Sequence, residues 1–339
     1  MKAVKINKPF DVQIVEMDKP QIEKKDDVIL KVTSGGICGS DMGIWQGTNS
    51  LATYPRLIGH EFGGIVTEVG EDVSSISEGD LVAVDPVVSC GKCYACTHGH
   101  PNVCKDVEVM GVHRNGGFSE YVKAPARNIH KFSKPYDETL VGLVEPYSIG
   151  TEVNNRADIQ ENDKVLILGS GPIGVTTMQV AKRRGAEVMI TDLVQERLDL
   201  AKEMGADIIV NTKQNNLNDY LKDFNNGEGP TVVVDTVCQP ATFKQSIEVA
   251  SPAGRVVVLS TNNKEVTTDA SLITKKGLTI VGSRLNNGRF PEVIEGFENG
   301  SLNPEKLMSK QIDFNNVESE GFKVIKETPE KVMKVVLKF

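Results

Sequence analysis

The segment from Lys164 to Gly185, KVLILGSGPIGVTTMQVAKRRG, decides the fold of the middle of this chain. A short apolar run leads into a Gly-x-Gly-x-x-Gly pattern, and apolar residues at helical spacing follow it. Between a strand and a helix, the first glycine permits a tight turn and the second admits a pyrophosphate, while the third lets the helix pack on the strand. The helix N-terminus also favours phosphate charge. We therefore expect a dinucleotide to bind at Gly169, Gly171, Pro172, Ile173 and Gly174.

The next apolar run, EVMITD, ends at Asp192, which lies 18 residues after Gly174. A carboxylate at this position accepts hydrogen bonds from the adenosine ribose and repels a 2′-phosphate, so the sequence predicts NAD rather than NADP. Arg197 leaves an alternative open, because an arginine could also hold the adenine or a phosphate.

Six apolar runs alternate with helical patterns between residues 163 and 283, which is typical of a doubly wound parallel sheet. Ser283 and Arg284 follow the last run and are further candidates for binding the cofactor. By contrast, residues 1–134 form short apolar runs broken by Gly, Pro and Asp, which predicts a β-rich domain.

The composition limits the classes of function that need consideration. A chain of 339 residues suits two domains, and 38 basic against 46 acidic residues give a net charge of −8 without a basic patch for nucleic acid. No apolar run approaches the roughly 18 residues of a membrane helix, and the charged N-terminus lacks a signal-peptide pattern. We expect a cytoplasmic protein with no nucleic-acid or membrane partner.

Four of the six cysteines crowd into a loop at about residues 88–106. In a cytoplasmic chain, this spacing favours one tetrahedral zinc ion over disulfides, with an iron–sulfur cluster as a weaker alternative. The ion would be structural, because four protein ligands leave no position for a substrate. His98 and His100 lie in the same loop and are expected to be solvated rather than ligands. The expected ligands are Cys90, Cys93, Cys96 and Cys104.

Several further motifs together resemble the zinc-containing medium-chain alcohol dehydrogenases, in particular the sorbitol and hexonate dehydrogenase branch. They include GICGSD from Gly36, GHEFGG from Gly59, GGFSEY from Gly116 and Glu145-Pro146, beside the four-cysteine loop and the nucleotide motif. The resemblance covers nearly the whole chain. It implies an α/β chain with a GroES-like β-rich catalytic domain and a Rossmann domain with a doubly wound parallel sheet. The expected ranges are 1–148 with 285–339 for the GroES-like domain and 149–284 for the Rossmann domain.

The resemblance also implies a catalytic zinc, in addition to the structural one. Cys38, His60 and Glu145 are the implied ligands, and Glu61 is a further or exchangeable one. The residues alone leave open which glutamate binds directly. Ser40 would take the alcohol proton.

One departure from the family concerns this proton path. Related enzymes often carry a histidine five residues after the zinc cysteine, where this chain has Gly43. A proton relay that ends in a histidine is therefore in doubt.

The resemblance implies an NAD-dependent oxidation of a secondary hydroxyl on a polyol or a sugar acid, such as the hexonate galactonate. The alternative is a nucleotide-binding regulatory protein of the same fold with weak or no dehydrogenase activity. The resemblance implies a homodimer or homotetramer with two zinc ions per subunit. Candidates for the substrate cleft are Tyr54, Arg56, His113, Arg114, Phe118 and Arg284.

Overall fold

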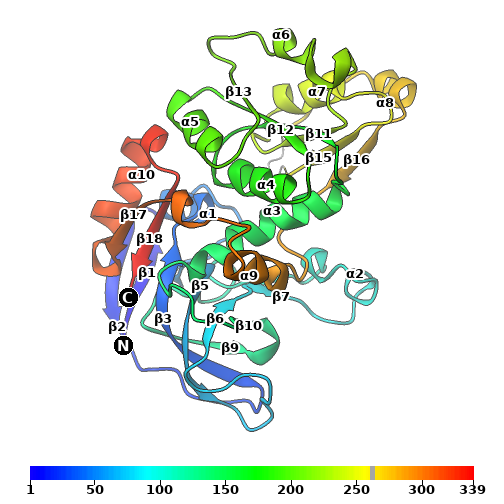
Figure 1. Cartoon of the computed structure of the whole chain (residues 1–339). Helices are drawn as coiled ribbons and strands as arrows, with labels where there is room; N and C mark the ends of the chain where they lie inside the picture. Colours follow the sequence, from blue (N-terminus) through cyan, green and yellow to red (C-terminus); the bar gives the residue numbers. More distant parts are fainter. Residues whose placement is uncertain (260–263) are drawn as a thin grey trace. The chain divides into compact units, whose positions relative to one another are not determined.

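The computed structural model describes residues 1–259 and 264–339. The chain divides into two compact units (Figure 1). The first unit contains residues 1–148, 286–300 and 307–339, and the second contains residues 149–285 and 301–306. Ser260, the last residue of the apolar run that begins at Arg255, lies outside the described residues.

The second unit is built on a six-stranded parallel sheet with the order β13-β12-β11-β14-β15-β16. The chain starts at the central strand β11, builds outward through β12 and β13, and then continues on the other side with β14. This reversal beside β11 is where ligands bind in such sheets, outside the carboxyl ends of the strands. The expected doubly wound parallel sheet is confirmed. Its strands are β11 (Lys164–Leu168), β12 (Glu187–Asp192), β13 (Ile208–Asn211), β14 (Val232–Asp235), β15 (Arg255–Val258) and β16 (Thr279–Gly282).

Helices connect these strands and pack on the sheet. Helices α4 and α5 contact β11, β12 and β13, whereas α7 contacts β14 and β15. The side chains between strands and helices form an apolar core that includes Leu166, Met189 and Val233. The helices are α4 (Pro172–Arg183), α5 (Gln195–Glu203), α6 (Leu217–Leu221), α7 (Pro240–Val249) and α8 (Ala270–Lys276), while α3 (Val144–Arg156) contains the point where the chain passes between the units.

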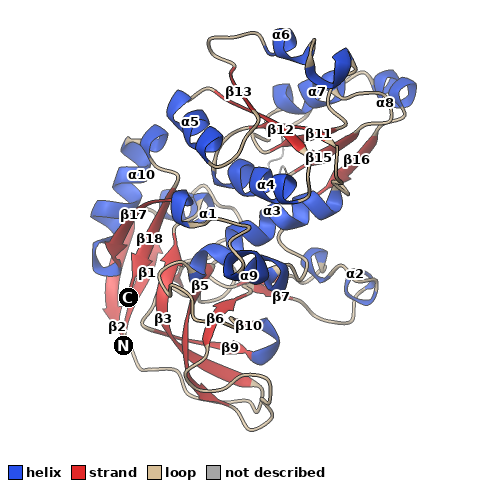
Figure 2. Ribbon diagram, viewed as in Figure 1, coloured by secondary structure: helices blue, strands red, loops and turns tan. Residues whose placement is uncertain are grey.

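The first unit is rich in β-structure, as expected for the N-terminal part of the chain (Figure 2). Its largest sheet has the order β10-β6-β5-β3-β18-β17, with β9 also paired to β3. The C-terminal strand β18 pairs with β3, so the end of the chain completes a sheet that the N-terminal part begins. The strands of this sheet are β3 (Asp27–Gly36), β5 (Glu61–Val69), β6 (Leu81–Val84), β9 (Tyr121–Pro125), β10 (Ile129–Lys131), β17 (Met308–Asp313) and β18 (Lys334–Lys338).

Smaller elements complete the first unit. A three-stranded sheet has the order β2-β1-β4, and a two-stranded sheet pairs β7 with β8. None of the helices that the structure describes combines the length and the apolar composition of a membrane-spanning segment. These elements are β1 (Lys2–Lys8), β2 (Asp11–Glu16), β4 (Arg56–Leu57), β7 (Val87–Val88), β8 (Glu108–Val109), α1 (Gly39–Gln46), α2 (Tyr94–Thr97), α9 (Phe290–Glu298) and α10 (Lys323–Glu327).

Candidate active site

The four-cysteine lobe, residues 88–106, brings all four of its thiols together. The sulfur atoms lie within 4.8 Å of one another, and such a set of donors suits a zinc ion. Backbone N–H groups of Cys90 and Asp106 donate to Cys104 Sγ over 3.4 and 3.3 Å. N–H groups of Cys96 and Lys105 lower the pKa of the Cys93 thiol to about 6, and a thiolate is the form that binds metal.

The two histidines of this lobe are not part of the cluster of ligand atoms found among the described residues. His98 donates from Nδ1 to the carbonyl of Tyr94 over 2.8 Å, and its ring stacks on the Tyr94 ring at 4.0 Å. His100 lies exposed at the surface. Both rings therefore lie outside this group of ligand atoms, and their solvated role stays a prediction.

A second cluster of ligand atoms lies inside the first unit. The Cys38 thiol, a ring nitrogen of His60 and a carboxylate oxygen of Glu61 lie within 4.8 Å of one another. Cys38 is the residue before helix α1, and Glu61 opens strand β5. His60 is 6% and Glu61 1% exposed. Thiolate, imidazole and carboxylate together suit a zinc site that keeps a fourth position open.

Asp41 supports this cluster and was missed at the level of sequence. Its Oδ2 accepts a hydrogen bond from the Cys38 N–H at 2.9 Å, and its Oδ1 lies 3.4 Å from His60 Nδ1. These last two atoms are buried without another hydrogen-bond partner. Burial lowers the pKa of His60, but the charges of Asp41 and Cys38 outweigh burial and hold it well above its ordinary value. Asp41 therefore orients the imidazole, as carboxylates beside metal-bound histidines do.

Ser40 lies on the other side of the same imidazole. Its Oγ is 3.2 Å from His60 Nε2, and the backbone carbonyl of Ser40 accepts a hydrogen bond from Asn49 at 3.5 Å. The structure thus brings Cys38, Ser40 and His60 together, as the resemblance implies.

Glu145 is buried near the start of helix α3. Burial raises its pKa to about 8; the charge of Glu61 adds to this effect, whereas His60 and Lys334 oppose it. Among the described residues, the group of ligand atoms within 4.8 Å of one another contains Glu61 and not Glu145. The charges of His60, Glu61 and Lys334 therefore act on Glu145, although its carboxylate is not part of that group of ligand atoms.

Lys334, the first residue of the C-terminal strand β18, forms a buried ion pair with Glu61. Its Nζ donates to both carboxylate oxygens, over 2.6 and 2.8 Å. The Glu61 carboxylate lies against Gly36, where an added Cβ would come within 2.1 Å of Oε2. An added Cβ at this position would therefore displace the carboxylate. Lys334 was also missed at the level of sequence.

The candidates for a substrate cleft in the first unit can be placed one by one. Phe118 is wholly buried and its ring packs against Gly59 and Phe339, so it belongs to the core and not to a cleft. His113 accepts a hydrogen bond from the N–H of Val109 at 3.0 Å. The other three candidates in this unit have local contacts: Arg114 pairs with Glu108 at 3.2 Å, Arg56 donates to Thr53, and Tyr54 donates to the carbonyl of Ile44.

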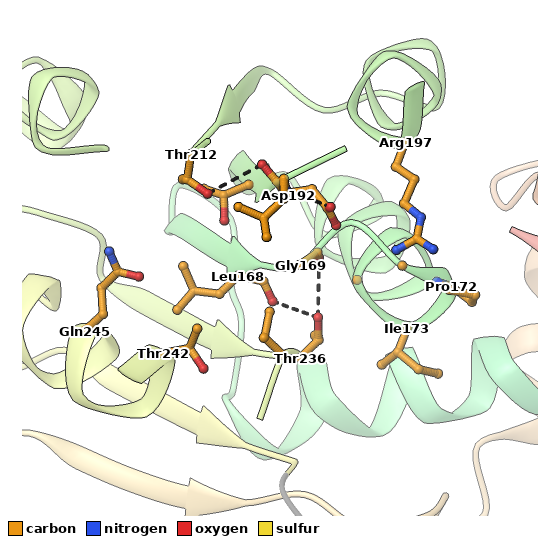
Figure 3. A pocket seen from close by; sticks show the side chains of 15 residues that line it. Leu168, Gly169, Pro172, Ile173, Asp192, Arg197, Thr212, Thr236, Thr242 and Gln245 are labelled. Carbon is orange, nitrogen blue, oxygen red and sulfur yellow. Dashed lines mark hydrogen bonds between the residues drawn. The ribbon is translucent and has the colours of Figure 1, made fainter. Parts of the chain in front are cut away.

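The expected nucleotide motif lines a cavity of about 470 Å³ in the second unit (Figure 3). Gly169 has φ of 97°, and an added Cβ on Gly174 would come within 2.0 Å of the Gly169 carbonyl oxygen. A Cβ on Gly171 would meet no atom within 4 Å, so this glycine faces open space where a phosphate could approach. The lining residues include Gly169, Gly171, Pro172, Ile173, Gly174, Asp192, Arg197, Thr212, Thr236, Thr242 and Gln245.

Asp192 lies at the end of β12 on this cavity, near Thr212 in Figure 3. Its carboxylate accepts backbone N–H groups from Ser170 at 2.8 Å and from Leu193 at 2.7 Å. These bonds fix the carboxylate beside the glycine turn. Among the described residues, Ser283 and Arg284 are not part of the lining; Ser283 is buried and Arg284 is exposed.

The chain matches two family models. Residues 24–134 match the alcohol dehydrogenase GroES-like domain, and residues 172–299 match the zinc-binding dehydrogenase domain. These matches confirm the expected GroES-like and Rossmann architecture.

Known proteins resemble the chain over most or all of its length. The starvation-sensing protein RspB of Escherichia coli K12 is 41% identical over 100% of this chain and 99% of its own. An L-threonine 3-dehydrogenase of Bacillus licheniformis is 37% identical over 78% of this chain and 77% of its own.

Solved structures agree with these relatives. A crystal structure of RspB from E. coli CFT073 with NADH has a TM-score of 0.94 and 40% identity, covering 100% of this chain and 99% of that one. Galactitol-1-phosphate dehydrogenase of E. coli has a TM-score of 0.92 and 27% identity, with full coverage of both chains at 100%. The chain therefore belongs to the zinc-type medium-chain alcohol dehydrogenase family.

Proposed function

We propose that this protein is a zinc-dependent and NAD-dependent dehydrogenase that oxidises a secondary hydroxyl on a small polyol or sugar acid. The observation that carries the proposal is the cluster of a half-buried Cys38 with the buried His60 and Glu61, in a chain that also has a nucleotide cavity. A structural or regulatory relative without catalysis has no need for a buried mixed-ligand metal site.

Cys38 and His60, with Glu61 or Glu145, would hold the catalytic zinc, and the four-cysteine lobe would hold a structural one. When bound, zinc supplies Lewis acidity that lowers the pKa of an alcohol, and NAD supplies a hydride acceptor. The chain's own part is to fix these groups. Asp41 orients His60 through the ring nitrogen that faces it at 3.4 Å.

Ser40 is the proposed acceptor of the alcohol proton. Its hydroxyl lies 3.2 Å from His60 Nε2, so it is beside a proposed zinc ligand. Oxidation of an alcohol to a carbonyl releases one hydride and one proton; the hydride leaves from carbon and the proton leaves from oxygen. With Gly43 in the next turn of α1, the path beyond Ser40 would lead to water rather than to a histidine.

In the nucleotide cavity, we propose that Asp192 accepts hydrogen bonds from the adenosine ribose and disfavours a 2′-phosphate. The NADH complex of RspB supports this choice. Arg197 lines the same cavity and would contact the adenine side of the cofactor. Ser283 and Arg284 remain candidates for contacts with the rest of the cofactor.

The substrate class is supported by the relatives. L-threonine and galactitol 1-phosphate, which two of them are named for, carry secondary hydroxyl groups beside other polar groups. A homodimer or homotetramer is also proposed, because β16 is an edge strand whose residues are only partly covered.

A second candidate is a regulatory protein that binds the nucleotide but turns over slowly. The name of RspB, a starvation-sensing protein, and the glycine at position 43 favour it.

The experiment that separates the two candidates is NADH formation, followed at 340 nm, on a panel of polyols, hexonates and hydroxy amino acids. NADP and a zinc-depleted sample serve as controls. The dehydrogenase proposal expects NAD-dependent turnover of at least one substrate that disappears when zinc is removed. A zinc-loaded protein that binds NADH but stays silent across the panel would favour the regulatory candidate.

A further inference from the structure

The ammonium group of Lys334 is one of the most deeply enclosed charges in the first unit. The residue is only 3% exposed, and its partner Glu61 only 1%. Burying a charge is costly unless it is paired and its hydrogen-bonding groups are satisfied. A lysine at this depth therefore has its position fixed by its partners.

All three N–H donors of Lys334 can be assigned to partners. Two point to the Glu61 oxygens, and the third points to the carbonyl oxygen of Ile37 at 3.2 Å. Ile37 precedes Cys38, and Glu61 follows His60. One side chain thus ties together the two chain segments that carry the candidate metal ligands.

The strand that carries Lys334 is held against the same segment. The N–H of Ile37 donates to the carbonyl of Val335 at 2.9 Å, and Val336 pairs with Gly36 in the antiparallel ladder of β18 and β3. Gly36 leaves room for the Glu61 carboxylate. The C-terminal strand, far from Cys38 in sequence, therefore delivers a cation to the metal cluster.

A cation that binds both oxygens withdraws electron density from a carboxylate and weakens it as a metal ligand. Since Glu61 also lies within ligand distance of Cys38 and His60, two cations would compete for it when zinc is bound. Without the lysine, the full charge of the carboxylate would be available to the metal ion.

We propose that Lys334 is a positioning residue of the catalytic zinc site that keeps Glu61 a weak and exchangeable ligand, so that the ion retains a position open to substrate. This inference rests on the proposed function. In this proposal, Lys334 on the last strand makes Glu61 a weaker ligand than Glu145.

The test compares the zinc-loaded wild type with Lys334→Met in the rate at which zinc passes to a chromogenic chelator. Zinc is expected to leave the two sites in two kinetic phases. The variant Cys38→Ala lacks the catalytic site, so the phase that is missing from it belongs to that site. The proposal expects Lys334→Met to release its catalytic zinc at least about 10-fold more slowly than the wild type. This is the lower end of the range known for residues that contact metal ligands. A residue that merely supported the site would have the opposite effect, because its loss would speed the release of zinc.

Cobalt substitution gives a second readout that does not depend on activity. The proposal expects the visible d–d absorption of the Co²⁺ form to shift in Lys334→Met, because the Glu61 carboxylate would replace the exchangeable ligand at the open position. It also expects KM to rise more than kcat falls, since Glu61 would compete with the substrate oxygen for the open position, and Lys334→Arg to retain the wild-type spectrum.

Two controls isolate the ion pair. Lys338→Met removes an exposed lysine from the same strand and should change nothing. Lys334→Met combined with Glu61→Gln removes both charges and should release zinc at least as fast as the wild type. The fluorescence of Trp45, the single tryptophan, reports whether helix α1 remains folded in each variant.

The outcomes are distinct. Release from Lys334→Met at the wild-type rate or faster, with an unchanged cobalt spectrum, overturns the inference and leaves Lys334 a purely structural residue. If Lys334→Met does not fold, Glu61→Gln decides: the proposal expects it to retain zinc far better than Cys38→Ala, and equally fast loss from both overturns it. A wild type that binds only one zinc would instead overturn the proposed function.

Discussion

The four-cysteine lobe and the Cys38 cluster each gather metal-binding side chains within 4.8 Å, but their surroundings differ. The lobe is a loop of residues 88–106 with a one-turn helix, and two backbone N–H groups of the loop donate to the sulfur of Cys104. The Cys38 cluster is enclosed by a sheet and a helix, and it is stabilised by the charged side chains of Asp41 and Lys334. A local loop can gather four like ligands, whereas the mixed set of ligands is supported by residues from distant parts of the chain.

The largest effect is expected for loss of a ligand in the buried cluster. His60→Ala should reduce kcat/KM by about 1,000-fold or more, because several kcal/mol of Lewis-acid stabilisation disappear and each ~1.4 kcal/mol is tenfold. Zinc content should fall from two ions per chain to one, while the melting temperature changes little. Steady-state kinetics and metal analysis check this. Activity within tenfold of the wild type would show that the cluster is not the catalytic site.

Loss of a ligand in the lobe should lower the stability of the protein more than its activity. Cys104→Ala removes the buried thiol of the set and leaves a loop that cannot order itself without metal. We expect protease cleavage within residues 88–106 and a lower melting temperature, by about 2–4 °C for each kcal/mol lost. Limited proteolysis and calorimetry measure both. If Cys104→Ala abolished turnover while remaining folded and resistant to protease, the division of roles between the two clusters would be wrong.

Acid releases zinc from thiolate, imidazole and carboxylate ligands. His130 lies outside both clusters and makes the stability of the protein depend on pH by a separate route. Burial lowers the pKa of His130 to about 4, and its ring stacks on Phe290 at 5.1 Å. The stability gained from the neutral ring is complete above pH 6.5 and is lost as the pH falls toward 4, a change of at most about 3 kcal/mol.

His130→Phe keeps the stacking and removes the proton. The difference in melting temperature between pH 7.5 and pH 5 should shrink in this variant, whereas zinc release in acid should stay as in the wild type. An unchanged pH dependence of stability would mean that metal loss alone accounts for the acid sensitivity.

A smaller effect is expected for the carboxylate behind His60. Asp41→Asn keeps the size of the side chain but removes its charge, so zinc affinity at the buried cluster should fall by about 10- to 100-fold. His98→Ala is the matched change in the lobe and should leave zinc binding there unaltered, since His98 contacts Tyr94. Competition with a chelator measures both. Equal losses at the two sites would contradict the contrast between them.

The smallest effect is expected at Gly43, inside helix α1. An added Cβ would lie 3.4 Å from Asn49 Cβ and 3.5 Å from Thr48 Oγ1, so the helix can accept it. Gly43→Ala should stabilise the protein by about 0.5–1 kcal/mol through helix propensity without changing kcat. Denaturant unfolding measures the gain. A large fall in kcat would show that the space the new methyl group fills serves the proton path.

Sequence patterns predicted the elements that depend on local periodicity. The run from Lys164 predicted β11 and α4, and the spacing of the four cysteines predicted the lobe. Each of these patterns lies within a few neighbouring residues. The resemblance named Cys38, Ser40 and His60, which the structure brings together. Their roles in catalysis remain proposals.

Contacts between distant segments could not be predicted in the same way. Lys334 lies 273 residues from Glu61, in a C-terminal segment where several lysines are exposed, and only the pairing of β18 with β3 shows that it turns inward. Phe118 was expected near a cleft because aromatic residues often line one, but the glycine at position 59 makes room for it in the core. Asp41 could have been found, since it stands three residues after Cys38 at a helix start.

The most direct test of the central claim is the zinc dependence of NADH formation by the purified wild-type protein on the substrate panel. The account predicts two zinc ions per chain, turnover with NAD that is lost when a chelator removes the ion of the Cys38 cluster, and recovery when zinc is added back. Full turnover by protein from which that ion has been removed would contradict it.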